Sequence, residues 1–89
     1  MFNASTNNPA AKALLQGVVD LLAEFDDEVW IIDYKTDRVS NFATEQTMLK
    51  RRYDIQMKYY LQAIRDLFPQ KRVLAKVYFM RVGEVVEYV

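Results

Sequence analysis

Two apolar segments on either side of Asp26 and Asp27 constrain the fold of this chain more than any other feature. The first, Leu14 to Phe25, is mostly β-branched or aliphatic and lacks helical periodicity, so it predicts a strand. Val29 to Lys35 predicts a second strand, and the Asp-Asp pair between them is a turn signal. Because the connection is so short, the two strands must pair as an antiparallel hairpin.

This hairpin predicts that Asp20 and Asp33 are neighbours. A tight turn at Asp26-Asp27 places them directly opposite each other on one face, with Cβ atoms about 4.5–5.5 Å apart. Lys35 lies two residues beyond Asp33 and therefore on the same face. Opposed like charges destabilise a hairpin, so something must offset the repulsion. A divalent cation does so, because two hard oxygen ligands at this separation suit Mg²⁺ or Mn²⁺.

A plainer interpretation is a pair of solvent-facing acids with Lys35 as their salt-bridge partner, which is the commoner situation for two acids taken at random. Here, however, three polar groups converge within strands of Val, Ile, Leu and Trp. A polar residue inside an apolar strand is the informative exception. The sequence therefore favours a metal site.

The rest of the chain predicts one long helix and a second pair of strands, in the order ββαββ. Thr44 to Phe68 predicts the helix, with Thr44 as its N-cap and Pro69 just past its end. Arg72 to Arg81 alternates like a strand, and a tight turn at Gly83 leads into a short last strand, VVEYV. The fold class is therefore α/β.

One face of the predicted helix carries residues at steps of three and four, the spacing of a face that packs on a sheet. Gln56 interrupts this otherwise apolar stripe, and Tyr60 follows one turn later. When Gln56 is considered alone, a core amide that is hydrogen-bonded to the backbone explains it equally well. Beside the carboxylates, Gln56 and Tyr60 look like groups that orient a phosphate or Lys35. The stripe consists of Leu49, Tyr53, Gln56, Tyr60, Ile64 and Leu67.

Composition excludes several classes of site. The chain has no cysteine and no histidine, which excludes disulfides, thiolate or imidazole zinc sites and a Ser-His-Asp triad. Its apolar runs are far too short for a membrane span and its first residues do not resemble a secretory signal, so we expect a cytoplasmic protein with no membrane partner. The chemistry must come from carboxylates, lysine, arginine, tyrosine and amides.

The charges balance overall but are segregated along the chain. Met1 to Tyr34 holds one base and six acids, and Lys35 to Val89 holds 11 bases and six acids, giving net charges of −5 and +5. This pattern suits a cation held by carboxylates with a polyanion alongside, and solvated surface alone gives the same pattern.

Three motifs, in this order, resemble the signature of the PD-(D/E)XK nucleases: GVVD (Gly17–Asp20), DYKTDRV (Asp33–Val39) and QMKYY (Gln56–Tyr60). Together with the closing strand pair, they are most similar to the nuclease domain at the C-terminal end of AddA/RecB-type subunits of bacterial ATP-dependent helicase–nucleases. The resemblance covers roughly Leu15 to Val89. It implies a restriction-endonuclease-like fold, in which helices flank a mixed sheet.

The resemblance also implies a role for each residue at a matching position. Asp20 and Asp33 become metal-binding carboxylates, with the backbone carbonyl of Tyr34 as a further ligand. Lys35 becomes the residue that positions or activates the attacking water and stabilises the pentavalent phosphorane. The residues that support the active site and contact DNA are Gln56 and Tyr60.

For the whole protein, the resemblance implies Mg²⁺-dependent exodeoxyribonuclease activity, with Mn²⁺ as a substitute, in double-strand-break repair and recombination. DNA and a second subunit of the helicase–nuclease would be its partners. ATP would act only through a helicase part that this chain does not contain.

The start of the chain departs from the family pattern. In the family an earlier helix supplies a further acidic residue, or in some members a histidine, and another strand precedes the G-x-x-D strand. The sequence therefore predicts a fragment of a longer polypeptide, with a flexible segment over residues 1–13 and a partial nuclease domain over 14–89 that lacks the first helix and strand. Because an unpaired sheet edge invites pairing, we expect the isolated fragment to self-associate.

Other classes of function remain open. A nuclease-like domain that binds DNA or a partner subunit without cutting keeps the same fold but predicts no Mg²⁺ or Mn²⁺ binding at the hairpin. A plain α+β interaction domain predicts no salt-dependent affinity for DNA. A resolvase or restriction enzyme on the same scaffold fits the D-Y-K-T-D and Q-x-x-x-Y details less well.

Overall fold

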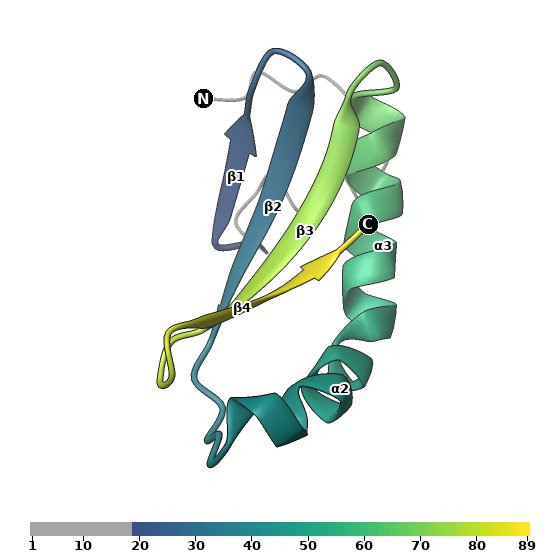
Figure 1. The fold of residues 1–89 in the computed structure, drawn as a ribbon. Coiled ribbons are helices and arrows are strands. Elements are labelled where there is room, and N and C mark those ends of the chain that lie inside the picture. Colours follow the sequence, from purple (N-terminus) through teal and green to yellow (C-terminus); the bar gives the residue numbers. More distant parts are fainter. Residues whose placement is uncertain (1–18) are drawn as a thin grey trace.

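The computed structural model describes residues 19–89, which form a four-stranded sheet and two helices (Figure 1). This confirms the α/β class predicted from the sequence. The segment over residues 1–13, predicted to be flexible, lies outside the described residues. In chain order the elements are β1 (Leu21–Glu24), β2 (Glu28–Lys35), α2 (Phe42–Arg52), α3 (Asp54–Leu67), β3 (Arg72–Phe79) and β4 (Glu84–Tyr88).

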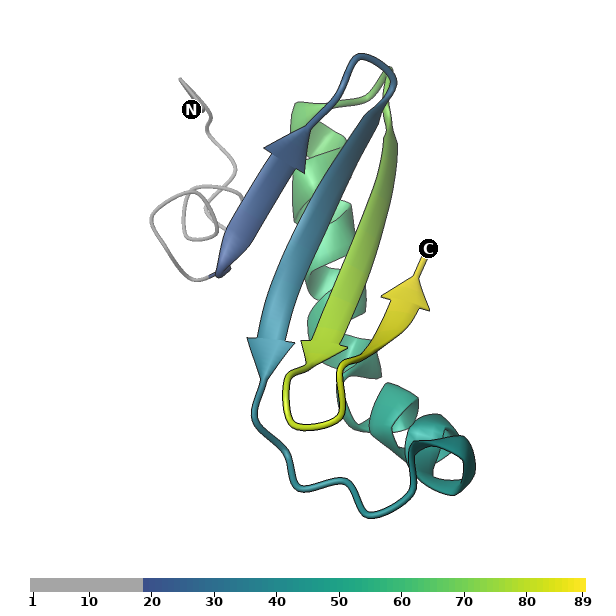
Figure 2. The same ribbon diagram turned by 60° about the vertical axis from the view of Figure 1, so that its left-hand side comes forward.

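The sheet is mixed, with strand order β1-β2-β3-β4. The outer pairs β1–β2 and β3–β4 are antiparallel, whereas β2 and β3 run parallel. Parallel neighbours need a long crossover, and α2 and α3 provide it between the end of β2 and the start of β3. Figures 1 and 2 show both helices on the same face of the sheet, with α3 along the strands and α2 near their lower end. No helix in residues 19–89 is long and apolar enough to cross a membrane.

The register of the β1–β2 hairpin is the one predicted. Leu21 pairs with Ile32 and Glu24 pairs with Val29. The turn is closed by a 2.8 Å hydrogen bond from the Phe25 amide to the Glu28 carbonyl. One further step along this register brings Asp20 next to Asp33. The Asp33 side chain belongs to the helix-facing side of the sheet, as do those of Val29 and Ile31, whereas the Asp20 carboxylate lies at the edge of β2, where the Tyr34 amide donates to it.

The predicted extent of the first strand, Leu14 to Phe25, is wrong within the described residues. β1 begins only at Leu21, and residues 14–18 lie outside the described part of the chain. The backbone bends at Val19 and Asp20, where the Asp20 Oδ2 atom accepts a 2.7 Å hydrogen bond from the Tyr34 amide. A continued ladder would bring a β1 carbonyl to that amide. The carboxylate takes the place of that carbonyl, and strand pairing stops.

The single helix predicted over Thr44–Phe68 is in fact two. α2 and α3 are separated at Tyr53, which has φ −107° and ψ 6°. The local sequence contains no glycine or proline that would explain the break. The break coincides with a tertiary contact, since the Tyr53 hydroxyl donates to the Asp37 carboxylate in the loop after β2.

The predicted N-cap, Thr44, is also wrong, because Asn41 caps α2. The Asn41 Oδ1 atom accepts a hydrogen bond from the Thr44 amide at 3.3 Å. Glu45 reaches back and its Oε2 atom accepts from the amides of Ser40 and Asn41, at 2.9 and 2.7 Å. This reciprocal arrangement satisfies amides that the first helical turn leaves unpaired.

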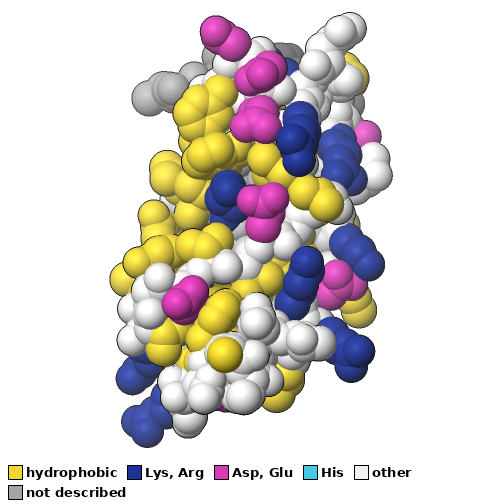
Figure 3. Space-filling model, viewed as in Figure 1, with side chains coloured by type: hydrophobic (Ala, Val, Ile, Leu, Met, Phe, Trp, Pro, Cys, Tyr) yellow, Lys and Arg dark blue, Asp and Glu magenta, His cyan; other side chains and the backbone are white. Residues whose placement is uncertain are grey.

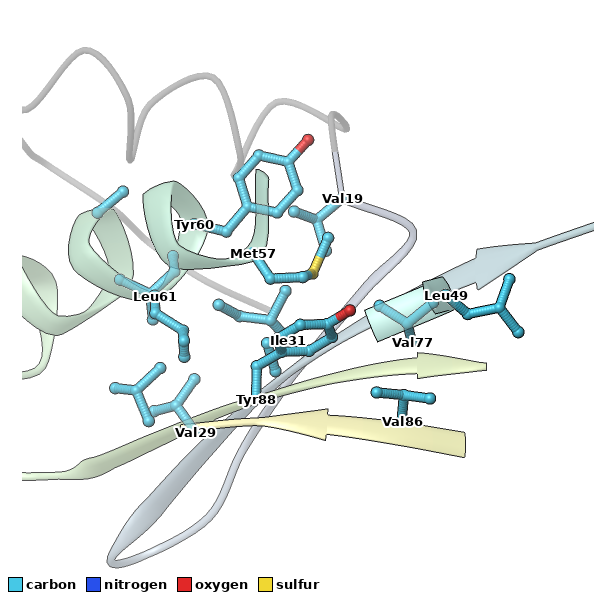
Figure 4. Close-up of a cluster of buried hydrophobic side chains, with 14 of the residues drawn as sticks. Val19, Val29, Ile31, Leu49, Met57, Tyr60, Leu61, Val77, Val86 and Tyr88 are labelled. Atoms are coloured by element: carbon cyan, nitrogen blue, oxygen red, sulfur yellow. The ribbon is translucent and has the colours of Figure 1, made fainter. Parts of the chain in front are cut away.

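The core lies between the helices and the inner strands. Val29 and Ile31 of β2 are fully buried, and Figure 4 shows Met57 and Leu61 of α3 directed at them. The predicted helix face was therefore only partly right. Leu49, Tyr60 and Ile64 are buried as expected, but Met57 and Leu61 occupy the centre, while Tyr53, Gln56 and Leu67 are half-buried at its margin.

The β3–β4 turn begins earlier than the alternating sequence predicts. β3 ends at Phe79 instead of Arg81, because the Phe79 carbonyl accepts from the amides of Val82 and Gly83 at 3.2 and 2.9 Å. Gly83 has φ +66°, a left-handed conformation that other residues adopt at a cost. The turn therefore depends on glycine at this position.

Candidate active site

Asp33 is the buried acid of the candidate site. It lies in β2 with 7% of its surface exposed, and it is the one charged or polar residue that is buried among residues 19–89. Burial raises the pKa of its carboxyl above the ordinary value of 3.8, and the hydrogen bond and charge of neighbouring Asp20 push in the same direction. Lys35 partly opposes this rise.

Asp20 is the exposed partner in this acid pair. The hydrogen bond from the Tyr34 amide lowers the pKa of its carboxyl, and the interaction with Asp33 lowers it further. Two adjacent carboxyls therefore have pKa values displaced in opposite directions, which is typical of functional sites and also of structural networks. A bound divalent cation would relieve the repulsion when both are ionised.

Lys35 ends β2 and brings a positive charge to the acid pair. Its Nζ atom lies 3.0 Å from Asp33 Oδ2 and 3.5 Å from Gln56 Oε1. Burial favours the neutral amine, but the hydrogen bond and charge of Asp33 outweigh this and raise the pKa of Lys35. The side chain is therefore an ammonium at neutral pH, suited to stabilising negative charge.

Gln56 and Tyr60 come from adjacent turns of α3, and Gln56 lies next to Lys35. The Gln56 Nε2 atom donates a 3.0 Å hydrogen bond to the Tyr60 hydroxyl. This fixes the orientation of the amide, so that its oxygen faces the Lys35 ammonium. The pair thus supports Lys35 from the helix side.

The backbone of Tyr34 points toward Asp20. Its amide donates to Asp20 Oδ2, and in a strand the amide and carbonyl of one residue point to the same edge. The next residue faces the other way, since the Lys35 carbonyl accepts from the Met80 amide at 3.0 Å. The Tyr34 carbonyl is therefore directed to the side where Asp20 lies. Its side chain is on the opposite face of the sheet, with its ring 5.9 Å from that of Tyr78.

Two residues that the sequence analysis did not assign to the site, Tyr53 and Asp37, complete it. The Lys35 Nζ atom lies 4.6 Å from the centre of the Tyr53 ring, within the range of a cation–π interaction. The Tyr53 hydroxyl is 2.8 Å from both carboxylate oxygens of Asp37, which also forms an ion pair with Arg52.

The same contacts determine the ionisation of Asp37. Burial favours its neutral form, but the hydrogen bonds from Tyr53 and Arg52 outweigh it and lower the pKa of Asp37. The sequence did contain features that could have pointed to these two residues, since Asp37 is part of the DYKTDRV motif and Tyr53 is part of the helical stripe. Their contact was hidden because it depends on the break between α2 and α3.

The donor set fits a hard divalent cation. Two carboxylates and one backbone carbonyl are oxygen ligands of the kind that Mg²⁺ and Mn²⁺ prefer. Mg²⁺ usually binds through one or two carboxylates and keeps several waters, so this small set is sufficient. No group of three or more acidic, histidine or cysteine side chains that could hold a metal occurs within residues 19–89.

The known proteins to which this chain is similar are described as nucleases or as subunits of a helicase/nuclease. A family model described as the PD-(D/E)XK nuclease superfamily matches residues 2–87. Curated relatives are named as one subunit of an ATP-dependent helicase/nuclease. The relative from Listeria welshimeri is 40% identical over 70 residues, which cover 74% of this chain. The relative from Ruminiclostridium cellulolyticum is 40% identical over 77 residues, and that from Lacticaseibacillus casei is 34% identical over all 89. The chain spans only 6–7% of the length of these relatives.

Proposed function

The chain belongs to the PD-(D/E)XK nuclease superfamily, and we propose that it hydrolyses DNA phosphodiesters with the help of a divalent cation. The observation that supports this most strongly is the convergence of Asp20, Asp33 and Lys35 at one end of the sheet. Two carboxyl groups can hold a divalent cation, and an ammonium beside them can stabilise the negative charge that develops in metal-assisted phosphoryl transfer.

We assign Asp20, Asp33 and the Tyr34 carbonyl as ligands of Mg²⁺, with Mn²⁺ as a substitute. When bound there, the metal supplies Lewis acidity toward the phosphate and lowers the pKa of a water molecule. Asp33, held in place by β2 and by Lys35, would provide a fixed carboxylate ligand for the cation. Asp20 contributes a carboxylate that stays ionised because of the hydrogen bond from the Tyr34 amide.

Lys35 provides the positive charge during the reaction. As water adds to phosphorus and the bond to the 3′ oxygen breaks, negative charge grows on the non-bridging oxygens. An ammonium already held by Asp33, Gln56 and the Tyr53 ring needs little reorganisation to stabilise that charge. Its raised pKa favours charge stabilisation and water positioning over a role as general base.

For the longer protein, we propose that residues 14–89 are part of the nuclease domain of an ATP-dependent helicase–nuclease, preceded by the segment 1–13. The names of the relatives support this assignment. The proposed activity is that of a cytoplasmic exodeoxyribonuclease in double-strand-break repair and recombination. It would work with a second subunit, and ATP would be used by the helicase part.

A catalytically silent nuclease-like domain is the second candidate. It is favoured by one observation, that residues 19–89 bring only two carboxylates together at this site. Self-association of the isolated chain also stays a proposal, because β1 and β4 are edge strands of the described sheet.

The test is DNA cleavage by the intact helicase–nuclease that contains this chain. We expect Asp33→Ala to abolish Mg²⁺-dependent cleavage while ATP-dependent unwinding continues at its normal rate. Asp26→Asn is the matched control, because it changes an exposed acid in the turn at the far end of the hairpin. Undiminished cleavage by Asp33→Ala would refute the proposal, whereas a silent domain predicts no cleavage by the unsubstituted protein.

A further inference from the structure

A shallow cleft of about 410 Å³ lies just beyond the candidate active site, between the loop after β2 and the β3–β4 turn. Its lining consists of Arg38, Val39, Ser40 and Arg81. Two of these four residues are arginines and none is acidic. Figure 3 shows basic side chains projecting at the lower left, where Figure 1 has this turn and this loop.

Two hydrogen bonds attach the turn to the chain immediately after Lys35. The Met80 amide donates to the Lys35 carbonyl at 3.0 Å, and Arg81 Nε donates to the Thr36 carbonyl at 2.7 Å. The second bond uses only the Nε–H of the guanidinium. The N–H groups of the two terminal nitrogens of Arg81 therefore remain available as donors, while the bond from Nε holds the guanidinium in place.

The arginines of the cleft also lack carboxylate partners. Among residues 19–89, the ion pairs hold Arg52, Lys71 and Lys76 against acids, but none involves Arg38 or Arg81. Both side chains are exposed, and Arg38 makes no hydrogen bond within the described residues. An anion can therefore bind them without breaking an existing ion pair.

We propose that this cleft binds phosphates of the DNA strand whose scissile phosphodiester lies at Asp20, Asp33 and Lys35; the inference rests on the proposed function. Thr36, which anchors Arg81, is three residues beyond Asp33, or about 10 Å of extended chain. The cleft is therefore close enough to the acid pair to meet phosphates near the scissile phosphodiester on the same strand. Guanidinium groups bind phosphate oxygens through paired hydrogen bonds, so the cleft sets the path of the strand without reading its bases.

The test measures binding of a single-stranded oligothymidylate to the chain over a range of salt concentrations, in EDTA. For single strands the slope of log K against log salt is about −0.7 per phosphate contacted. Replacing both arginines (Arg38→Ala with Arg81→Ala) should therefore make the slope shallower by about 1.4. At low salt we also expect the affinity to fall about tenfold or more. The lysine pair Arg38→Lys with Arg81→Lys should keep most of the slope.

Arg65→Ala is the matched control, because Arg65 is an exposed arginine near the far end of α3, about 13 Å of helix beyond Gln56. Circular dichroism of each variant establishes that the fold is kept. An unchanged slope in the double alanine variant would overturn the proposal that the cleft binds phosphates, and so would an equal decrease of the slope in Arg65→Ala. Either result would leave the proposed hydrolysis intact. Absence of salt-dependent binding by the unsubstituted chain would overturn both.

Discussion

The Lys35 ammonium lies 4.6 Å from the centre of the Tyr53 ring, at the point where α2 ends and α3 begins. The break between the two helices is therefore part of the site. Tyr53 leaves regular helical geometry, its hydroxyl bonds to Asp37, and its ring supports the lysine that also contacts Asp33.

Removing the Tyr53 ring should impair the reaction without abolishing metal binding. We expect Tyr53→Leu to lower kcat of the intact helicase–nuclease about tenfold, because a partly buried cation–π contact contributes about 1–2 kcal/mol. Tyr53→Phe keeps the ring under Lys35 and should lose about threefold at most. KM for DNA should change little in both. Equal losses in the two variants would contradict the role of the ring and point to the hydroxyl.

Replacing Lys35 should separate metal binding from catalysis. Lys35→Met removes the ammonium that we propose stabilises charge on the phosphate, and we expect kcat to fall about 10²-fold or more. Mn²⁺ affinity, measured by calorimetry near neutral pH, should be kept or increase, since a repulsive cation next to the carboxylates is gone. Loss of Mn²⁺ binding in Lys35→Met would show that the lysine mainly holds the carboxylates in place.

Much of this site could be predicted from the sequence, because it depends on local pairing. The short turn at Asp26-Asp27 determines the register, and the period of two in β2 places Asp33 and Lys35 on one face. Gln56 and Tyr60 follow in the same way from helical spacing. These relationships need no knowledge of distant parts of the chain.

The missed features depend on contacts between distant segments. Tyr53 and Asp37 are 16 positions apart, and the sequence around Tyr53 carries no helix-breaking residue. From the sequence alone, Asp37 resembles a solvent-exposed acid in a loop. Only the folded structure places Arg52 and Tyr53 in contact with it. The late start of β1 likewise involves a side chain, that of Asp20, which accepts from the Tyr34 amide that a strand carbonyl would otherwise bind.

The Asp37 contacts should also make stability depend on pH. The pKa of Asp37 is lowered in the folded state, so its contribution is complete above the ordinary value of 3.8 and is lost as pH falls through the lower folded value. Asp37→Asn should therefore reduce the free energy of unfolding by about 1.5 kcal/mol at pH 7. The measurement is urea unfolding of both proteins at several pH values. The difference should shrink below pH 3.8; a constant difference down to about pH 2 would contradict the assignment.

Gly83 should be sensitive to substitution for reasons of backbone conformation alone. A Cβ atom there would have as its nearest neighbour the Tyr78 hydroxyl, at 3.8 Å, so there is space for it. Its φ of +66° disfavours other residues, and we expect Gly83→Ala to lower the free energy of unfolding by about 1–2 kcal/mol. Gly83→Asn should cost less, because asparagine tolerates this region better. Equal effects of the two substitutions in thermal unfolding would argue against a conformational cause.

The most direct test of the account is a Mn²⁺ titration of the chain, followed by paramagnetic broadening of its amide signals. We expect the earliest and strongest broadening at Asp20 and at Asp33 to Lys35, with the amides of the Asp26-Asp27 turn largely unaffected. Asp33→Asn should abolish this pattern, and Asp26→Asn should leave it unchanged. Broadening centred elsewhere, or a pattern that survives Asp33→Asn, would contradict the claim that the paired aspartates form the metal site.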